Sequence, residues 1–158
     1  MAAQKKFNFK LLWEFEMDMR KSAVIFGLTN RVQQRSILLA DCGIACVAML
    51  AGCSYDQARK ALGFGKDEDE FYTRHHDIRR GLQHLGCEVK LKRFVSWRKL
   101  PGKAIVAVNH TKDGAYWHWV VFDGEAILDP KPNRPERKTD LRGLLGRGRY
   151  LALMPNRD

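Results

Sequence analysis

Apolar and polar residues follow different periods in successive parts of the chain. From Phe7 to Met19 a large apolar residue occupies every odd position, which predicts a half-buried strand, although the spacing of some of these residues also suits a helix. After residue 40 this alternation gives way to patterns typical of helices and then of strands. We therefore divide the chain into an N-terminal extension, residues 1–30, and a main domain, residues 31–158.

Three helices are predicted in the first half of the main domain. The first is continuously apolar, begins beside Asp41 and ends at Gly52, which are typical start and stop signals. The second carries the capping-box pair Ser54 and Gln57, and the third ends at Gly86. Their approximate ranges are 44–51, 54–62 and 74–85.

After Gly86 the period changes to two, and turn residues separate short runs rich in Val, Ile, Phe and Trp. Such runs predict strands of an antiparallel sheet. A short helix is expected around 140–145. The predicted strands are 89–94, 104–108, 117–122, 126–128 and 150–154. Helices followed by a sheet predict an α+β domain.

Composition limits the function classes without choosing one. The 158 residues suffice for one domain with a sizeable core, and 28 Lys and Arg against 18 Asp and Glu give a net charge of +10. Half of that excess lies after Asp129, where the sequence contains eight basic and three acidic residues. This basic C-terminal tail suits an acidic partner or nucleic acid, although a solvated charged face is its commoner origin.

The cysteines and apolar runs bear on location. Three of the four cysteines fall within residues 42–53, and no secretory signal precedes them, so we expect reduced thiols in a cytoplasmic protein. Secretion as an effector stays open. The longest apolar run, 45–52, is far shorter than the roughly 20 residues that cross a membrane, so no span is expected.

Cys42 stands where the chain enters the first helix. Unpaired N–H groups at a helix start favour a thiolate over a thiol, which makes Cys42 a candidate nucleophile. The competing interpretation is a small buried apolar residue, the usual role of a free cysteine.

A predicted hairpin supplies the partners that a nucleophilic cysteine needs. If Asp123 and Gly124 form a two-residue type I′ turn, the numbers of paired residues sum to 247, which puts His118 directly opposite Asp129. A carboxylate at that place would hold the imidazole in one tautomer. Thiol, imidazole and carboxylate together make a nucleophilic triad.

Two further interpretations remain beside the triad. The spacing of His84 and Cys87 suits zinc ligands, and His75, His76, Cys42 and Cys46 are also available. The paired short spacings typical of structural zinc are absent from the sequence, however, and we expect no cofactor. Basic and aromatic residues together suit a nucleic-acid-binding module without catalysis, although no recognised motif accompanies them.

Several of these segments resemble one enzyme family. The segment from Asp41-Cys42-Gly43 to Met49, the helices after it, the run from His118 to Val121 and the pair Asp129-Pro130 are similar to the papain-like double-glycine (bacteriocin) leader peptidases and their stand-alone relatives. The resemblance covers roughly residues 32–155. It implies a papain-like α+β fold and a cysteine peptidase acting on a peptide or protein substrate.

The same resemblance implies individual roles. Cys42 would be the nucleophile, His118 the general base and acid, and Asp129 the residue that orients His118. Family members use a glutamine upstream of the cysteine for the oxyanion, and here the nearest are Gln34 and Gln33, eight and nine positions before Cys42, which is further than usual. Acyl or amide transfer, or amidase activity, by the same triad remains an alternative, since both use the same acyl-enzyme.

Overall fold

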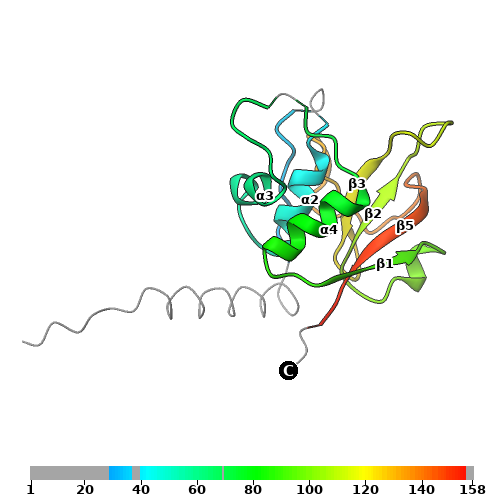
Figure 1. Ribbon diagram of the computed structural model, residues 1–158. Helices are drawn as coiled ribbons and strands as arrows, with labels where there is room; N and C mark the ends of the chain where they lie inside the picture. Colours follow the sequence, from blue (N-terminus) through cyan, green and yellow to red (C-terminus); the bar gives the residue numbers. More distant parts are fainter. Residues whose placement is uncertain (1–28, 37–39, 69, 156–158) are drawn as a thin grey trace, which may run out of the picture.

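The computed structural model describes residues 29–36, 40–68 and 70–155. Within these ranges three α-helices, α2 (Cys42–Ala51), α3 (Tyr55–Ala61) and α4 (His75–His84), gather on one side of a sheet (Figure 1). The strand or helix predicted for residues 7–19 lies outside the described residues. Helix α2 is the inner helix, because all ten of its residues are buried.

The sheet follows the helices in sequence, as predicted. In the described part of the chain it has five strands, paired antiparallel throughout in the order β1-β5-β2-β3-β4. A 3-10 turn at Trp97–Lys99, which the sequence pattern did not predict, follows β1. The strands are β1 (Val89–Arg93), β2 (Ala104–Val108), β3 (His118–Phe122), β4 (Ile127–Leu128) and β5 (Gly146–Leu153).

Successive side chains of a strand point to opposite faces of the sheet. In this sheet both faces are covered, and each forms part of a buried core. Trp119 and Val121 of β3 face the helices and share a core with α2, whereas Val120 and Phe122 belong to a second core on the opposite face. Residues of the connecting loops, among them Leu141 and Leu144, cover that second face. The α+β arrangement predicted from the sequence is confirmed.

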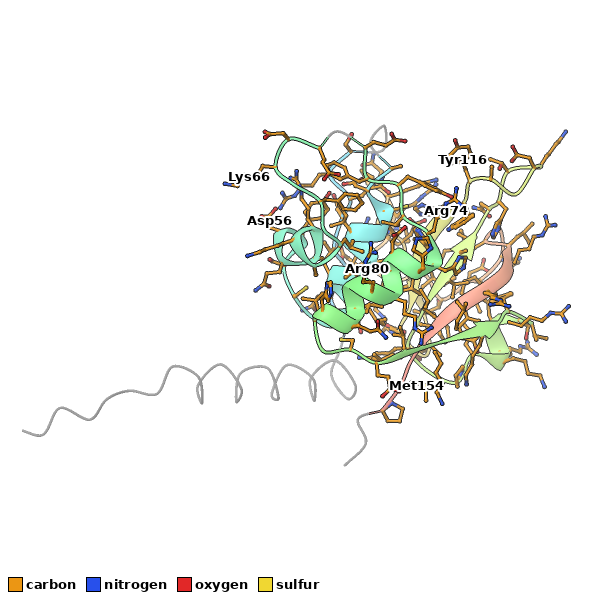
Figure 2. All side chains as sticks on the ribbon, in the orientation of Figure 1. Asp56, Lys66, Arg74, Arg80, Tyr116 and Met154 are labelled. Atoms are coloured by element: carbon orange, nitrogen blue, oxygen red, sulfur yellow. The ribbon has the colours of Figure 1, made fainter. Side chains whose placement is uncertain are left out.

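Local signals set the helix ends. Gly52 takes the left-handed conformation (φ 64°) that ends α2, and Ser54 and Gln57 form the predicted capping box at the start of α3. Asp77 accepts a hydrogen bond from the backbone N–H of Arg74 at the start of α4. Asp56 on α3 and Arg80 on α4 are exposed side chains of the helical layer (Figure 2).

The helix predicted at 140–145 is wrong. The Asp140 carboxylate accepts hydrogen bonds from the backbone N–H and the guanidinium of Arg142, and Gly143 has a φ of 80°, so the chain makes a turn instead. This is the known competition between a short polar side chain and the helical backbone. The closing strand β5 begins directly after this turn, earlier than predicted.

The predicted hairpin register is also wrong, by two residues. Val121 pairs with Leu128 and Phe122 with Ile127, so paired numbers sum to 249. The Asp123 carboxylate accepts from the backbone N–H groups of Glu125 and Ala126, and the Asp123 N–H donates to the Ala126 carbonyl, which lengthens the turn to residues 123–126.

Among the described residues no helix is both long and apolar enough to cross a membrane.

Candidate active site

Cys42 opens helix α2 at the boundary between the helical layer and the sheet. The residue is 8% exposed. Its sulfur accepts a hydrogen bond from the backbone N–H of Trp119, so the thiol lies against the peptide group that joins His118 to Trp119. The cysteine of the helical half and the histidine of the sheet half are thereby neighbours, which sequence separation alone does not reveal.

The protonation of Cys42 differs from the expectation of a thiolate. Burial raises the pKa of the thiol to about 11, and the Asp41 carboxylate adds to the rise, while the backbone N–H groups of Trp119, Gly43 and Cys42 itself lower it. The helix start therefore acts in the predicted direction but is outweighed by burial. A thiol with a pKa raised in this way is protonated at neutral pH.

His118 and Asp129 form a buried pair. The His118 Nε2 atom lies 2.7 Å from Asp129 Oδ1, and the residues are 9% and 6% exposed. In the observed register Asp129 would stand across from Val120, diagonal to His118 rather than opposite it. The two side chains still share a face, because a shift of two residues preserves the alternation. Their predicted contact is confirmed.

The Asp129 carboxylate is held in its ionised form. Burial raises its pKa, but the hydrogen bonds from His118 and from the Lys131 backbone N–H together lower it by more, so that the net pKa lies below its ordinary value. An ionised carboxylate only accepts hydrogen bonds, so Nε2 of His118 carries a proton toward it. That leaves Nδ1 of the neutral imidazole as the nitrogen with a lone pair.

A segment far upstream fixes the backbone around Asp129. The Arg31 guanidinium, whose side chain is 1% exposed, donates to the carbonyls of Asp129 (2.7 Å) and Lys131 (2.6 Å) and pairs with Glu136. The backbone N–H of Gln34 donates to the carbonyl of Pro130 at 2.8 Å. We call residues 31–36 the strap.

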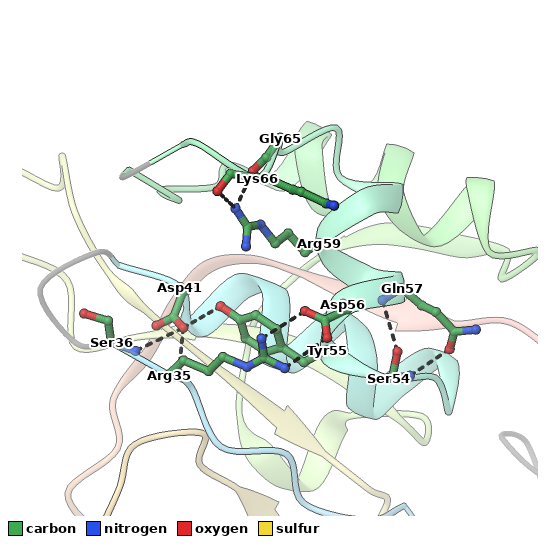
Figure 3. A network of polar contacts seen from close by, with 10 residues as sticks. All are labelled: Arg35, Ser36, Asp41, Ser54, Tyr55, Asp56, Gln57, Arg59, Gly65 and Lys66. Carbon is green, nitrogen blue, oxygen red and sulfur yellow. Dashed lines mark hydrogen bonds and ion pairs between the residues drawn. The ribbon is translucent and has the colours of Figure 1, made fainter.

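The other end of the strap is attached beside Cys42. The Asp41 carboxylate, 1% exposed, accepts from the backbone N–H groups of Arg35 (2.6 Å) and Ser36 (3.2 Å) and from the Tyr55 hydroxyl (2.6 Å) (Figure 3). Its side chain does not cap α2, contrary to the expectation for an aspartate at that position. The strap thus links the residues around Asp129 to those around Cys42.

The two glutamines named from the sequence differ in position. Gln33 is exposed, whereas Gln34 is 5% exposed and its Nε2 donates to Asp41 Oδ1 at 3.3 Å. Its Oε1 is buried without a hydrogen-bond partner. The reverse amide orientation would set Oε1 against a carboxylate, so Nε2 is the atom that faces Asp41.

Thr73 also helps to position the residues of the candidate site, and it was not identified from the sequence. Its carbonyl accepts from the Trp119 indole N–H at 3.2 Å, and a side chain on Gly43 would collide with its hydroxyl. The residue before helix α4 therefore lies over the start of α2. Glycine directly after a candidate nucleophile was the available signal for this close approach.

Two of the histidines weighed as zinc ligands lie against backbone carbonyls. A ring nitrogen of His84 lies 3.0 Å from the carbonyl of Ala61, and one of His75 lies 2.9 Å from that of Arg149. Over the described ranges, no three His, Cys, Asp or Glu side chains lie together in a group that would hold a metal ion.

Comparison with known proteins places the fold. No protein-family model matches the sequence, and no curated protein matches it. In structure the chain is similar to a double-glycine motif protease from an AMS/PCAT transporter, whose crystal structure was determined in complex with the leader peptide. The TM-score is 0.50 at 20% identity, over 79% of this chain and 90% of the other. This likeness shows a shared papain-like α+β fold.

Proposed function

We propose that the chain is a cysteine peptidase in which Cys42, His118 and Asp129 form the catalytic triad. The observation that carries the proposal is the buried pair of His118 and Asp129, which adjoins a cysteine at the start of a buried helix. The fold, shared with a cysteine peptidase, supports the same assignment.

The first step follows from the protonation states. The Cys42 sulfur attacks the carbonyl carbon of the scissile bond while His118 Nδ1 takes the thiol proton. The imidazolium then donates that proton to the leaving amine, the C–N bond breaks, and a thioester remains on Cys42. Asp129 stabilises the imidazolium through the bond to Nε2. Because the resting thiol is neutral, proton transfer accompanies the attack rather than preceding it.

Two donors are available for the negative charge that develops on the carbonyl oxygen. The backbone N–H of Cys42 lies at the helix start, and Gln34 is the buried glutamine held beside it through Asp41. We assign the oxyanion role to these two groups. The exposed Gln33 is not retained for this role.

The second step decides the class of enzyme. When water attacks the thioester with His118 as base, the product is an acid and the reaction is hydrolysis of a peptide or isopeptide bond. When an amine attacks instead, the product is a new amide. The substrate in either case is a peptide or protein, consistent with the leader peptide bound by the similar protease.

The test uses short synthetic peptides that contain a Gly-Gly pair. Wild type is expected to release two fragments, and hydroxylamine is expected to intercept the thioester as a peptide hydroxamate, both detected by mass spectrometry. Cys42→Ala and His118→Ala are expected to abolish both products. Addition of a primary amine tests for transfer, since only a transferase would convert most of the acyl-enzyme to amide.

The control is Cys53→Ala, which removes the partly exposed cysteine outside α2. This variant should retain full activity. Peptide cleavage that survives Cys42→Ala would refute the proposed nucleophile, and cleavage without any trappable hydroxamate would refute the covalent route.

A further inference from the structure

A cavity with a volume of about 340 Å³ lies directly beside the candidate triad. Asp129 forms part of its wall, so the cavity and His118 share this one carboxylate between them. The cavity is also lined by Leu144, which packs against the second sheet face, and by Asn109, which follows β2. Its remaining lining comes from the basic tail: Lys131, Arg134, Pro135, Lys138, Arg142 and Gly143.

Two of the cavity's four cations are lysines on anchored backbone. Lys131 is tied through its N–H to Asp129 and through its carbonyl to Arg31. Lys138 exchanges two backbone hydrogen bonds of 2.8 Å with Ile127, beside β4. Both lysines are half-buried. Their positions next to the triad are therefore set by the same contacts that set Asp129.

The two arginines are more exposed and partly neutralised. The Arg134 Nε atom lies 3.8 Å from Asp129 Oδ2, and Arg142 pairs with Asp140, which also lies near Lys138. Four cations against Asp129 in the wall and Asp140 at the margin leave an excess of positive charge. Partly desolvated cations favour an anionic ligand at that place.

We propose that this cavity binds a carboxylate of the peptide substrate, so that the enzyme selects acidic peptides. The inference rests on the proposed function, because Asp129 places the cavity one side chain away from the reacting bond. A volume of about 340 Å³ is at the lower end for ligand pockets and suits one or two side chains.

The lining favours a carboxylate over nucleic acid. Single-stranded nucleic acid is bound by aromatic platforms along a basic groove. The cavity has Leu144 and Pro135 as its apolar residues and contains no aromatic ring among the described residues that line it. A lone carboxylate needs only cations in a short concave space, which is what the cavity offers.

The experiment measures binding by the full chain carrying Cys42→Ala, which cannot turn over. In a series of synthetic Gly-Gly peptides, Glu occupies each position outside the Gly-Gly pair in turn. Each Glu peptide has a matched Gln peptide, and every peptide is made with a free and with an amidated C-terminus. We expect one Glu position, or the free C-terminus, to tighten Kd about tenfold, the usual scale of one charge-assisted contact. The two arms separate a side-chain carboxylate from a terminal one.

Charge variants test the location. Lys138→Gln is expected to remove most of the preference for the carboxylate, and Lys138→Glu to reverse it. Lys90→Glu is the matched control, because Lys90 is exposed on β1 at the opposite edge of the sheet, and it should leave the preference intact. Thermal unfolding of each variant shows that the fold is retained.

Three results would overturn the inference. These are equal Kd values for all Glu and Gln peptides, an equal loss with Lys90→Glu, or Lys138-dependent binding of a single-stranded oligonucleotide without peptide discrimination. The proposed function fails separately. If wild type does not cleave the preferred peptide although Kd still depends on Lys138, the carboxylate site stands and the peptidase assignment does not.

Discussion

Two carboxylates are almost fully buried near the site, and they differ in what they hold. Asp41 accepts from two backbone N–H groups, a hydroxyl and an amide, none of which changes its charge near neutral pH. Asp129 accepts from the His118 imidazole, a type of group that can gain and lose a proton. The two carboxylates therefore differ in their partners rather than in their burial. Asp41 organises backbone, whereas Asp129 is placed to respond to a proton transfer.

In the proposed reaction the two carboxylates would also act in opposite senses. The charge of Asp41 raises the pKa of Cys42 and so disfavours the thiolate. Asp129, through its 2.7 Å contact with His118 Nε2, would support the imidazolium that the proposed proton transfer creates. The strap joins the two, because Arg31 and Gln34 bind around Asp129 while Arg35 and Ser36 bind Asp41.

The largest expected effect is on activity at Asp129. Asp129→Ala should lower kcat/KM by on the order of 10³-fold, because His118 loses both its orientation and its counter-charge. Asp129→Asn should lower it only about tenfold. Its amide oxygen can occupy the Oδ1 place, which accepts from both His118 and the Lys131 N–H, while the NH₂ group replaces Oδ2 and gives up the 3.8 Å ion pair with Arg134. Peptide cleavage kinetics measure both variants, and equal losses would contradict the orienting role.

Asp41 should show the opposite profile, with stability as the main loss. Asp41→Ala leaves the buried donors of Arg35, Ser36 and Tyr55 without their acceptor, which we expect to cost about 3 kcal/mol of unfolding free energy. Asp41→Asn should be milder, because the Gln34 amide can rotate and present its unpaired Oε1 to the new NH₂ group. Urea unfolding followed by tryptophan fluorescence measures both, and a stable Asp41→Ala chain would refute the structural role.

Arg31 should affect both quantities, since it anchors the backbone around Asp129. Arg31→Gln is expected to lose about 2 to 3 kcal/mol, because two carbonyls lose a buried charged donor. It should also lower kcat about tenfold with little change in KM, the pattern of a displaced catalytic group. Glu136→Gln is the control. Glu136 is 79% exposed and contacts only Nη1, so its loss should change neither kcat nor stability measurably.

The sequence predicts those parts of this arrangement that depend on neighbouring residues. The end of α2 at Gly52 and the capping box of α3 follow from local signals. The shared face of His118 and Asp129 survives the wrong register, because the error of two residues preserves the alternation. The strap was not predictable, since Arg31 binds residues about 100 positions away through their carbonyls, which carry no side-chain signature.

Alkaline pH should lower the free energy of unfolding through the ionisation of Cys42. The folded chain holds this proton more tightly, with the pKa raised from its ordinary value of about 9 to about 11. Its stabilising contribution is therefore complete below pH 9 and is lost as pH rises through 11, by about 3 kcal/mol in all. Cys42→Ser does not ionise, so its unfolding free energy should fall less between pH 8 and 10.5. Parallel curves for the two proteins would contradict the raised pKa.

The smallest effect is expected at Arg35, the strap residue whose side chain lies outside the buried network. Its guanidinium pairs with Asp56 at 2.9 Å and lies over the Tyr55 ring, but both charged side chains are more than half exposed. Exposed pairs contribute little, so Arg35→Gln should cost at most about 0.5 kcal/mol and leave peptide cleavage unchanged. The backbone N–H of Arg35, which carries the bond to Asp41, survives this substitution. A larger loss in urea unfolding would show that the strap is held by its surface side chains as well as by the Asp41 carboxylate and the backbone carbonyls around Asp129.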